Sequence, residues 1–304
     1  MSTAIALEPV VAPEPVVAAA APAVTTSPTI TYPALKAYAP SDVAGMIRGM
    51  EEDGYIVIRG LMSRAEVAEM HRRIDDLTPF AFDRKTDDKT GVDHLKCVFN
   101  RSPYWLQFID RPGAIDVVEG VLGNDAHIIG QTAWRSWPGA GGWGMHIDQQ
   151  FFPVDETLLK SGAVKLPMFL ATGHYYLNDM TLELCPTWIV PGSHKSGRGP
   201  GAKTGEDRSG FVAGQEDEWN GVKAVPVLLQ AGDFMLFRSE VWHTGSKNTT
   251  TDQTRYLLQV HYGRRVMAQR FSPYLDFRFN HEVLAAATPR QKRMLGGHQP
   301  GAYD

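Results

Sequence analysis

Cysteine is scarce in this 304-residue chain, which carries only Cys97 and Cys185. Two thiols are too few for a disulfide framework and too few for a cysteine-rich zinc site. They fit a reducing compartment, where thiols stay free. The composition therefore predicts a cytoplasmic protein whose two cysteines are ordinary buried thiols.

Excess positive charge is also absent, because 30 Lys and Arg residues face 34 Asp and Glu residues and the formal net charge is −4. Nucleic-acid binding depends mainly on cationic side chains that neutralise phosphates. We therefore expect no nucleic-acid partner and look instead for a small-molecule substrate.

Long apolar runs are missing as well. The longest one, around residues 16–24, is short and contains Pro22, whereas a membrane-spanning helix needs about 20 apolar residues. No basic segment precedes it, as a targeting signal would require. We expect no membrane partner. The Ala, Pro and Val composition of residues 1–33 predicts an extended disordered tail, followed by a single domain over residues 34–304.

Helical signals are concentrated before residue 125. Ser41 is a candidate N-cap for a first helix, which Gly54 would end. Ser63 and Glu66 have the spacing of a capping box, which predicts a second helix. A third helix is expected over residues 114–122.

From residue 128 onward, short β-prone runs alternate with Gly, Pro, Asn and Asp. Many short strands separated by regular turns are typical of a β-sandwich or barrel, and helices do not alternate with them as a βαβ fold requires. The polar, Gly-rich segment 192–221 is either a lid over the site or a surface insertion. The expected strands are 128–134, 144–149, 168–177, 187–190, 224–229, 233–237 and 255–262.

His146 and Asp148 are the first candidate site residues. They are two positions apart in the expected strand 144–149, and on a strand such residues point to the same face. An imidazole beside a carboxylate supplies two ligands of a 2-His-1-carboxylate site, which leaves open positions on Fe(II). Taken alone, the pair also fits a polar surface strand.

A second segment supports the metal hypothesis. The expected strand 233–237 leads to His243, which is remote from His146 in sequence and can return to the same place after several strands. The next strand begins at Arg255, and its alternation puts Leu257, Gln259 and His261 on the same face as Arg255. A guanidinium there can bind a carboxylate through two hydrogen bonds. The alternative is an arginine in solvent or in an ion pair.

These segments carry a family resemblance. Residues 42–303 resemble the phytanoyl-CoA dioxygenase family, which includes ectoine hydroxylase. The landmarks, in order, are His146-x-Asp148, the turn Pro191-Gly192-Ser193-His194, the strand that follows Gly232-Asp233, and His243…Asn248…Arg255.

The resemblance implies a mainly β fold with flanking helices, namely a double-stranded β-helix of the jelly-roll or cupin type. It implies Fe(II) with 2-oxoglutarate and O₂ as co-substrates, and ascorbate as an activator in vitro. By matching positions, His146, Asp148 and His243 are expected to bind the metal. Arg255 and Gln131 are expected to bind 2-oxoglutarate, although Gln131 is equally compatible with a strand amide facing solvent.

The implied activity is oxidation of a metabolite coupled to conversion of 2-oxoglutarate to succinate and CO₂. Hydroxylation is the expected outcome, because Asp148 is intact where related halogenases have a small residue. Desaturation, ring formation and epoxidation remain open, as does a non-catalytic metal-binding β-helix protein.

The substrate is expected to be small and partly apolar, as in secondary metabolism. Trp137-Pro138 stands where many relatives have Lys-Pro, which removes a cation from the expected pocket. Aromatic residues near the pocket mouth either contact substrate or simply fill the barrel. The candidate contacts are Trp134, Trp137, Trp143, Phe152 and Trp188.

Overall fold

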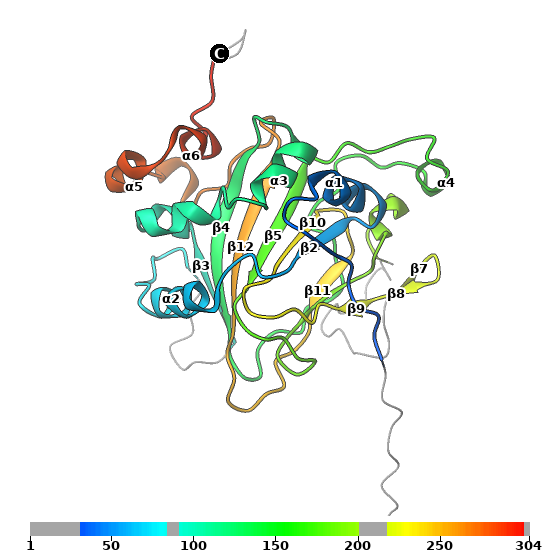
Figure 1. Ribbon diagram of the computed structural model, residues 1–304, viewed down its shortest axis with the longest axis horizontal. Coiled ribbons are helices and arrows are strands. Elements are labelled where there is room, and N and C mark those ends of the chain that lie inside the picture. Colours follow the sequence, from blue (N-terminus) through cyan, green and yellow to red (C-terminus); the bar gives the residue numbers. More distant parts are fainter. Residues whose placement is uncertain (1–30, 84–90, 201–217, 301–304) are drawn as a thin grey trace, which may run out of the picture. The chain divides into compact units, whose positions relative to one another are not determined.

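A seven-stranded sheet dominates the structure, a computed structural model that describes residues 31–83, 91–200 and 218–300. The strand order is β1, β2, β10, β5, β12, β4, β3 (Figure 1). Only β1 and β2 are parallel neighbours. The bounds are β1 Ala37–Tyr38, β2 Tyr55–Ile58, β3 Val92–Lys96, β4 His127–Ser136, β5 Leu170–Tyr176, β10 Phe234–Arg238 and β12 Arg255–Gly263.

Two smaller sheets complete the β structure. One has the order β11, β6, β9, and the other pairs β7 with β8. Their bounds are β6 Thr187–Ile189, β7 Glu218–Trp219, β8 Val222–Lys223, β9 Val225–Pro226 and β11 His243–Gly245. The mainly β class predicted from the sequence is confirmed.

Helices cover one face of the large sheet (Figure 1). The α-helices are α1 Val43–Glu52, α2 Arg64–Asp75, α3 Ile115–Leu122, α4 Glu156–Lys160, α5 His281–Ala286 and α6 Pro289–Met294, and the 3₁₀ helices are η1 Val98–Asn100, η2 Pro103–Phe108, η3 Ser193–Ser196 and η4 Tyr274–Asp276. None of the helices in the described ranges has the length and apolar character that a membrane crossing requires.

The two faces of the large sheet pack against different partners. Alternate residues such as Ile56, Tyr175 and Leu258 join the helices in the main apolar core. The intervening residues, such as Val57 and Leu257, form a second core with Ile189 of β6 and Val225 of β9. His243 begins β11, which pairs with β6, so the candidate site lies on the face of the large sheet turned away from the helices. Cys97 and Cys185 are free and buried, as predicted.

The helix starts follow the capping signals with one correction. The N-cap of α1 is Asp42, not Ser41, because the Asp42 carboxylate accepts a 2.9 Å hydrogen bond from the Gly45 amide. The capping box of Ser63 and Glu66 at the start of α2 is confirmed. The third predicted helix is present as α3.

The predicted strand 144–149 is wrong. This segment is extended but makes only an isolated bridge between His146 and His243. Just before it, Gly139, Gly141 and Gly142 all have positive φ, a conformation that turns the chain out of a regular ladder. The prediction for 224–229 was too long, since only β9 forms there and Pro226 has no amide hydrogen to extend the pairing.

The predicted tail and lid are not decided by this structure. Residues 1–30, and residues 201–217 of the segment 192–221, lie outside the described residues. The division into a tail and a domain therefore stays a prediction, and so does the role of that segment.

His194 belongs to the Pro-Gly-Ser-His turn and is buried. Its Nε2 lies 3.0 Å from the carbonyl oxygen of Glu51, which can only accept, so Nε2 carries the hydrogen. Burial and, to a smaller extent, the nearby Arg238 lower the pKa of His194 to about 3. The folded protein therefore keeps this imidazole neutral.

Acidification is expected to destabilise the fold through His194. With an unfolded pKa of 6.5 and a folded pKa of about 3, only the unfolded chain takes up this proton between those values, so stability rises with pH across that window. At pH 5.5 the cost is roughly 1 kcal/mol. His194→Gln can still donate to Glu51. Between pH 7.5 and 5.5 its free energy of unfolding, measured in urea, should fall by about that much less than the wild-type value. The exposed His281→Gln is the control, and an unchanged pH slope in His194→Gln would contradict the assignment.

Candidate metal centre

Three candidate ligands converge on the face of the large sheet away from the helices. The potential ligand atoms of His146, Asp148 and His243 all lie within 4.8 Å of one another. Two 2.9 Å backbone hydrogen bonds join His146 to His243 at the start of β11. Asp148 is fixed in turn by its amide, which donates to the carbonyl oxygen of Ser239. The structure thus brings together all three residues that the sequence singled out.

Backbone carbonyl groups fix the orientation of both histidine rings. Nδ1 of His146 lies 2.9 Å from the carbonyl oxygen of Gly144, and Nδ1 of His243 lies 2.9 Å from that of Val241. Because a carbonyl oxygen only accepts, each Nδ1 carries the hydrogen and each Nε2 keeps its lone pair. The Nε2 atom of His243 lies 3.5 Å from Oδ1 of Asp148.

Asp148 is oriented by a hydrogen-bonded pair from two neighbouring strands. The hydroxyl of Thr172 on β5 donates to Oδ2 of Asp148 at 3.1 Å. That leaves the Thr172 oxygen to accept from Nδ1 of His261 on β12, at 3.0 Å. Thr172 and His261 are direct cross-strand partners, so the sheet register itself sets the orientation of the carboxylate.

The electrostatics keep Asp148 ionised. Burial alone would raise the pKa of its carboxyl group, but the imidazoles of His243, His261 and His146 hold it well below its usual range. For His243, burial would lower the pKa, yet the Asp148 carboxylate raises it. A bound metal would displace any proton on Nε2 of His243, and one carboxylate oxygen with two imidazole nitrogens is a donor set that fits a 2-His-1-carboxylate Fe(II) site. Among the residues that the structure describes, no other such group of three possible ligands was found.

Thr172 offers a test of this orientation. Thr172→Val keeps the shape but removes the hydroxyl that joins Asp148 to His261, so metal affinity is expected to fall about 10–100-fold, as for other groups that orient ligands. Thr172→Ser keeps the hydroxyl and should retain most of the affinity. Competition of each variant with a chelator for Ni²⁺ measures the effect. Equal affinity in Thr172→Val and the wild type would contradict the role.

A cavity of about 300 Å³ opens beside the triad and contains Arg255. The Arg255 side chain is buried, and its Nη2 donates to the Thr187 hydroxyl at 3.1 Å. Its Nε has no hydrogen-bond partner, and no carboxylate of the described residues pairs with it. A buried guanidinium without a counter-ion is costly, so this cavity is suited to an anion.

His174 adds a second unpartnered donor to the same cavity. Trp134 donates its indole hydrogen to Oε1 of Gln259, so the amide nitrogen of Gln259 donates to Nε2 of His174, at 3.1 Å. The hydrogen of His174 is therefore on Nδ1, which has no partner within the described ranges. Burial lowers the pKa of His174 well below its usual value, and Arg255 lowers it further. His174 thus adds a neutral donor.

The strand prediction for the pocket face is confirmed. Arg255, Leu257, Gln259 and His261 all line this cavity. Gln131 does not. Its Nε2 donates to the carbonyl oxygen of Trp105, and the residue is fully buried. It lines a neighbouring cavity that does not contain Arg255, and it does not face solvent.

Two of the five aromatic candidates reach the cavity. Trp134 and Trp143 line it and contact each other edge to face, with ring centroids 6.3 Å apart. The remaining three do not line it. Trp137 donates to Asp93, Trp188 is only 1% exposed in the core, and Phe152 is 49% exposed beside Phe169.

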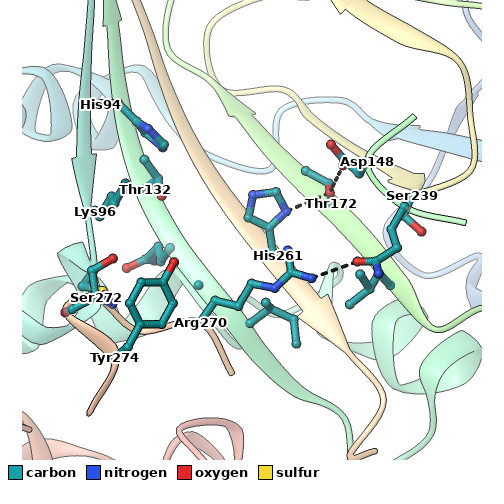
Figure 2. A pocket seen from close by; sticks show the side chains of 16 residues that line it. His94, Lys96, Thr132, Asp148, Thr172, Ser239, His261, Arg270, Ser272 and Tyr274 are labelled. Carbon is teal, nitrogen blue, oxygen red and sulfur yellow. Dashed lines mark hydrogen bonds between the residues drawn. The ribbon is translucent and has the colours of Figure 1, made fainter. Parts of the chain in front are cut away.

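A second cavity, also of about 300 Å³, is lined by Asp148 but by neither histidine of the triad (Figure 2). It shares His94, Asp148 and His261 with the Arg255 cavity. Sequence reasoning missed its polar residues on β3, although Val-Asp-His-Leu-Lys, residues 92–96, has the alternation that places His94 and Lys96 on one face. It also missed Arg270, for which no local pattern gives a signal.

The chain is similar to known dioxygenases. The model of the family described as phytanoyl-CoA dioxygenase (PhyH) matches residues 50–256. Dioxygenase af480 of Aspergillus fumigatus is 23% identical over 261 residues, which cover 81% of this chain and 74% of that protein. The multifunctional dioxygenase prhA of Penicillium brasilianum is 24% identical over 257 residues, covering 81% of this chain and 80% of its own.

Solved structures share the fold at lower identity. The α-ketoglutarate-dependent epimerase SnoN from nogalamycin biosynthesis has a TM-score of 0.57 and 18% identity, and the match covers 80% of this chain and 94% of SnoN. HygX from Streptomyces hygroscopicus, solved with nickel and 2-oxoglutarate, has a TM-score of 0.56 and 15% identity, with coverage of 74% and 88%. The predicted jelly-roll type of double-stranded β-helix is confirmed.

Proposed function

Since this chain belongs to the phytanoyl-CoA dioxygenase family and is a 2-oxoglutarate-dependent dioxygenase, we propose that His146, Asp148 and His243 bind its Fe(II) and that Arg255 binds 2-oxoglutarate. The observation that carries this proposal is a buried guanidinium that pairs with no carboxylate of the described residues, in a cavity that also contains the three ligands. Bound iron supplies O₂ activation, with 2-oxoglutarate as the source of two electrons, for oxidation of the substrate.

The protein's own contribution is to bind and orient. Arg255 offers its free Nε to one carboxylate of 2-oxoglutarate, and His174 offers its Nδ1 hydrogen to the same anion. Thr187 keeps the guanidinium in place through its hydroxyl. Trp134 and Trp143 form an apolar wall that limits water around the ligands.

Hydroxylation of a small, partly apolar metabolite is the proposed outcome. The intact Asp148 carboxylate supports oxygenation, because it occupies a metal position that a halide would otherwise need. Structural relatives include an epimerase and a carbocyclase, so the shared fold alone does not select the outcome. The choice depends on how the substrate is held beside the ligands.

Succinate formation tests the proposal. Purified protein with Fe(II), ascorbate, O₂ and 2-oxoglutarate is expected to release succinate, at a higher rate when a panel of candidate metabolites includes a substrate. In parallel, calorimetry without O₂ should detect 2-oxoglutarate binding only after Ni²⁺ has been added. Absence of both succinate and metal-dependent 2-oxoglutarate binding would instead support a non-catalytic metal-binding protein.

A further inference from the structure

The second cavity reaches the candidate metal site at Asp148, and Arg255 is not among its lining residues. Its walls include Lys96 of β3, Thr132 of β4, Arg270 and Tyr274. In Figure 2, Lys96 and Thr132 lie on one side of His261, and Thr172 and Asp148 lie on the other. An occupant of this cavity would therefore extend from the two cationic side chains to the carboxylate of the triad.

The charges in this cavity are not balanced. Lys96 is half-buried and Arg270 donates to the neutral side chain of Gln149 at 2.9 Å. Within the described ranges neither cation forms an ion pair, and Asp148 is the only acidic residue that lines the cavity. Once a divalent metal is bound at Asp148, the cavity retains excess positive charge, which attracts and orients anions.

His261 gives the cavity a hydrogen-bond acceptor as well. Because its Nδ1 hydrogen is donated to Thr172, its Nε2 keeps a lone pair. Figure 2 shows this free edge of the ring turned towards the side of the cavity where Lys96 and Thr132 lie. A hydroxyl or amine of an occupant can donate to Nε2 there, while Ile129 and Leu170 provide apolar contacts.

We propose that this cavity binds the oxidised substrate, and that the substrate is a small organic anion. Lys96 and Arg270 bind its anionic group, His261 accepts a hydrogen from a hydroxyl or amine, and the oxidised carbon lies beside Asp148. The inference rests on the proposed function, since it takes the triad as the metal site. It makes the expectation of a small, partly apolar substrate more specific, because the substrate would carry a negative charge at the end bound by Lys96 and Arg270.

Probes that share a phenyl group and a short chain test the charge preference. The protein is loaded with Ni²⁺ and 2-oxoglutarate and titrated with 3-phenylpropionate, its neutral amide and 2-phenylethyl phosphate, with binding followed by ligand-observed NMR. The anions are expected to bind about tenfold or more tightly than the amide, the range of a charged hydrogen bond. Comparing the two anions also shows whether the cavity binds a carboxylate or a phosphate more tightly.

Variants identify the side chains that cause the preference for anions. Lys96→Met and Arg270→Met should each weaken anion binding about tenfold and leave amide binding and 2-oxoglutarate binding unchanged, whereas Lys96→Arg should keep most of the preference. Lys165→Met is the matched control, since its side chain is 81% exposed and does not line this cavity. Thermal unfolding of each variant checks that the fold is intact.

The outcomes separate this inference from the proposed function. Equal affinity for the anions and the amide, with 2-oxoglutarate binding intact, would overturn the inference alone. So would a loss of 2-oxoglutarate affinity in Lys96→Met, because the cavity would then be the co-substrate site. If 2-oxoglutarate does not bind at all, the proposed function fails, and the same titration with Ni²⁺ alone still decides whether the cavity selects anions.

Discussion

Replacing His243 by alanine is expected to abolish metal-dependent succinate formation. His243 supplies an Nε2 lone pair at the centre, and its ring is held by the hydrogen bond from Nδ1 to the carbonyl oxygen of Val241. Loss of a group that merely orients a ligand costs about 10–100-fold in metal affinity, so loss of a ligand should cost at least the upper end of that range. Ni²⁺ competition and succinate release measure the two effects.

The backbone gives a reason to expect that His243→Ala still folds. The hydrogen bonds between His146 and His243 use main-chain atoms only, so the alanine variant can keep the bridge at the start of β11. His281→Ala is the matched control, because His281 is exposed at the start of α5. A well-folded His243→Ala protein that retains wild-type turnover would show that the triad is not the metal site.

Sequence alone predicted the parts of the site that depend on local periodicity. Strand β12 is central and pairs on both sides, so its two faces are fixed by alternation, and Arg255 and His261 lie where counting placed them. The capping box of Ser63 is local in the same sense. Such features depend on neighbours within a few residues, which a single sequence displays.

The structure brings His146 and Asp148 together for a different physical reason than expected. Their segment is not a strand, so period-2 alternation does not bring the side chains together. Instead, the backbone of His146 pairs with His243, and the amide of Asp148 donates to Ser239. Both partners lie far along the chain, which is why the spacing suggested the right residues but could not give the correct local structure.

Tertiary register decided the remaining residues. Gln131 and Thr132 are adjacent in sequence, yet only the pairing of β4 with β12 and β3 assigns Gln131 to the helix-covered face and Thr132 to the site face. Arg270 reaches the second cavity from a segment beyond β12. Neither placement follows from a pattern in the nearby sequence.

The two cavities divide the charges of the site between two anions. Arg255 lies in one cavity, Lys96 and Arg270 lie in the other, and Asp148 belongs to both. An arrangement with the cations apart allows two negatively charged molecules to approach the same metal without competing for one counter-ion. Replacing a cation in one cavity should therefore weaken the binding of only one of the two anions. The Arg255 variants test this for the co-substrate.

Arg255→Met is expected to lower the affinity for 2-oxoglutarate severely while metal affinity stays unchanged. The wild-type guanidinium is 6% exposed and has a free Nε for the incoming carboxylate. Removing one partner of a buried charge pair costs roughly 2–5 kcal/mol, which corresponds to about 30-fold to several thousandfold in Kd. Arg255→Lys keeps the charge but not the forked donor geometry and should fall between the two.

Thermal unfolding provides a readout that does not depend on turnover. A ligand that binds only the folded state raises stability in proportion to the logarithm of its concentration over Kd. With Ni²⁺ present, millimolar 2-oxoglutarate should therefore raise the melting temperature of the wild type and of the control Arg278→Met. Arg278 is exposed and donates to main-chain carbonyls of η4 and its C-cap. The co-substrate should leave the melting temperature of Arg255→Met almost unchanged. If Arg255→Met is stabilised as strongly as the wild type, 2-oxoglutarate is held by another cation, and Arg270 or Lys96 becomes the residue to replace next.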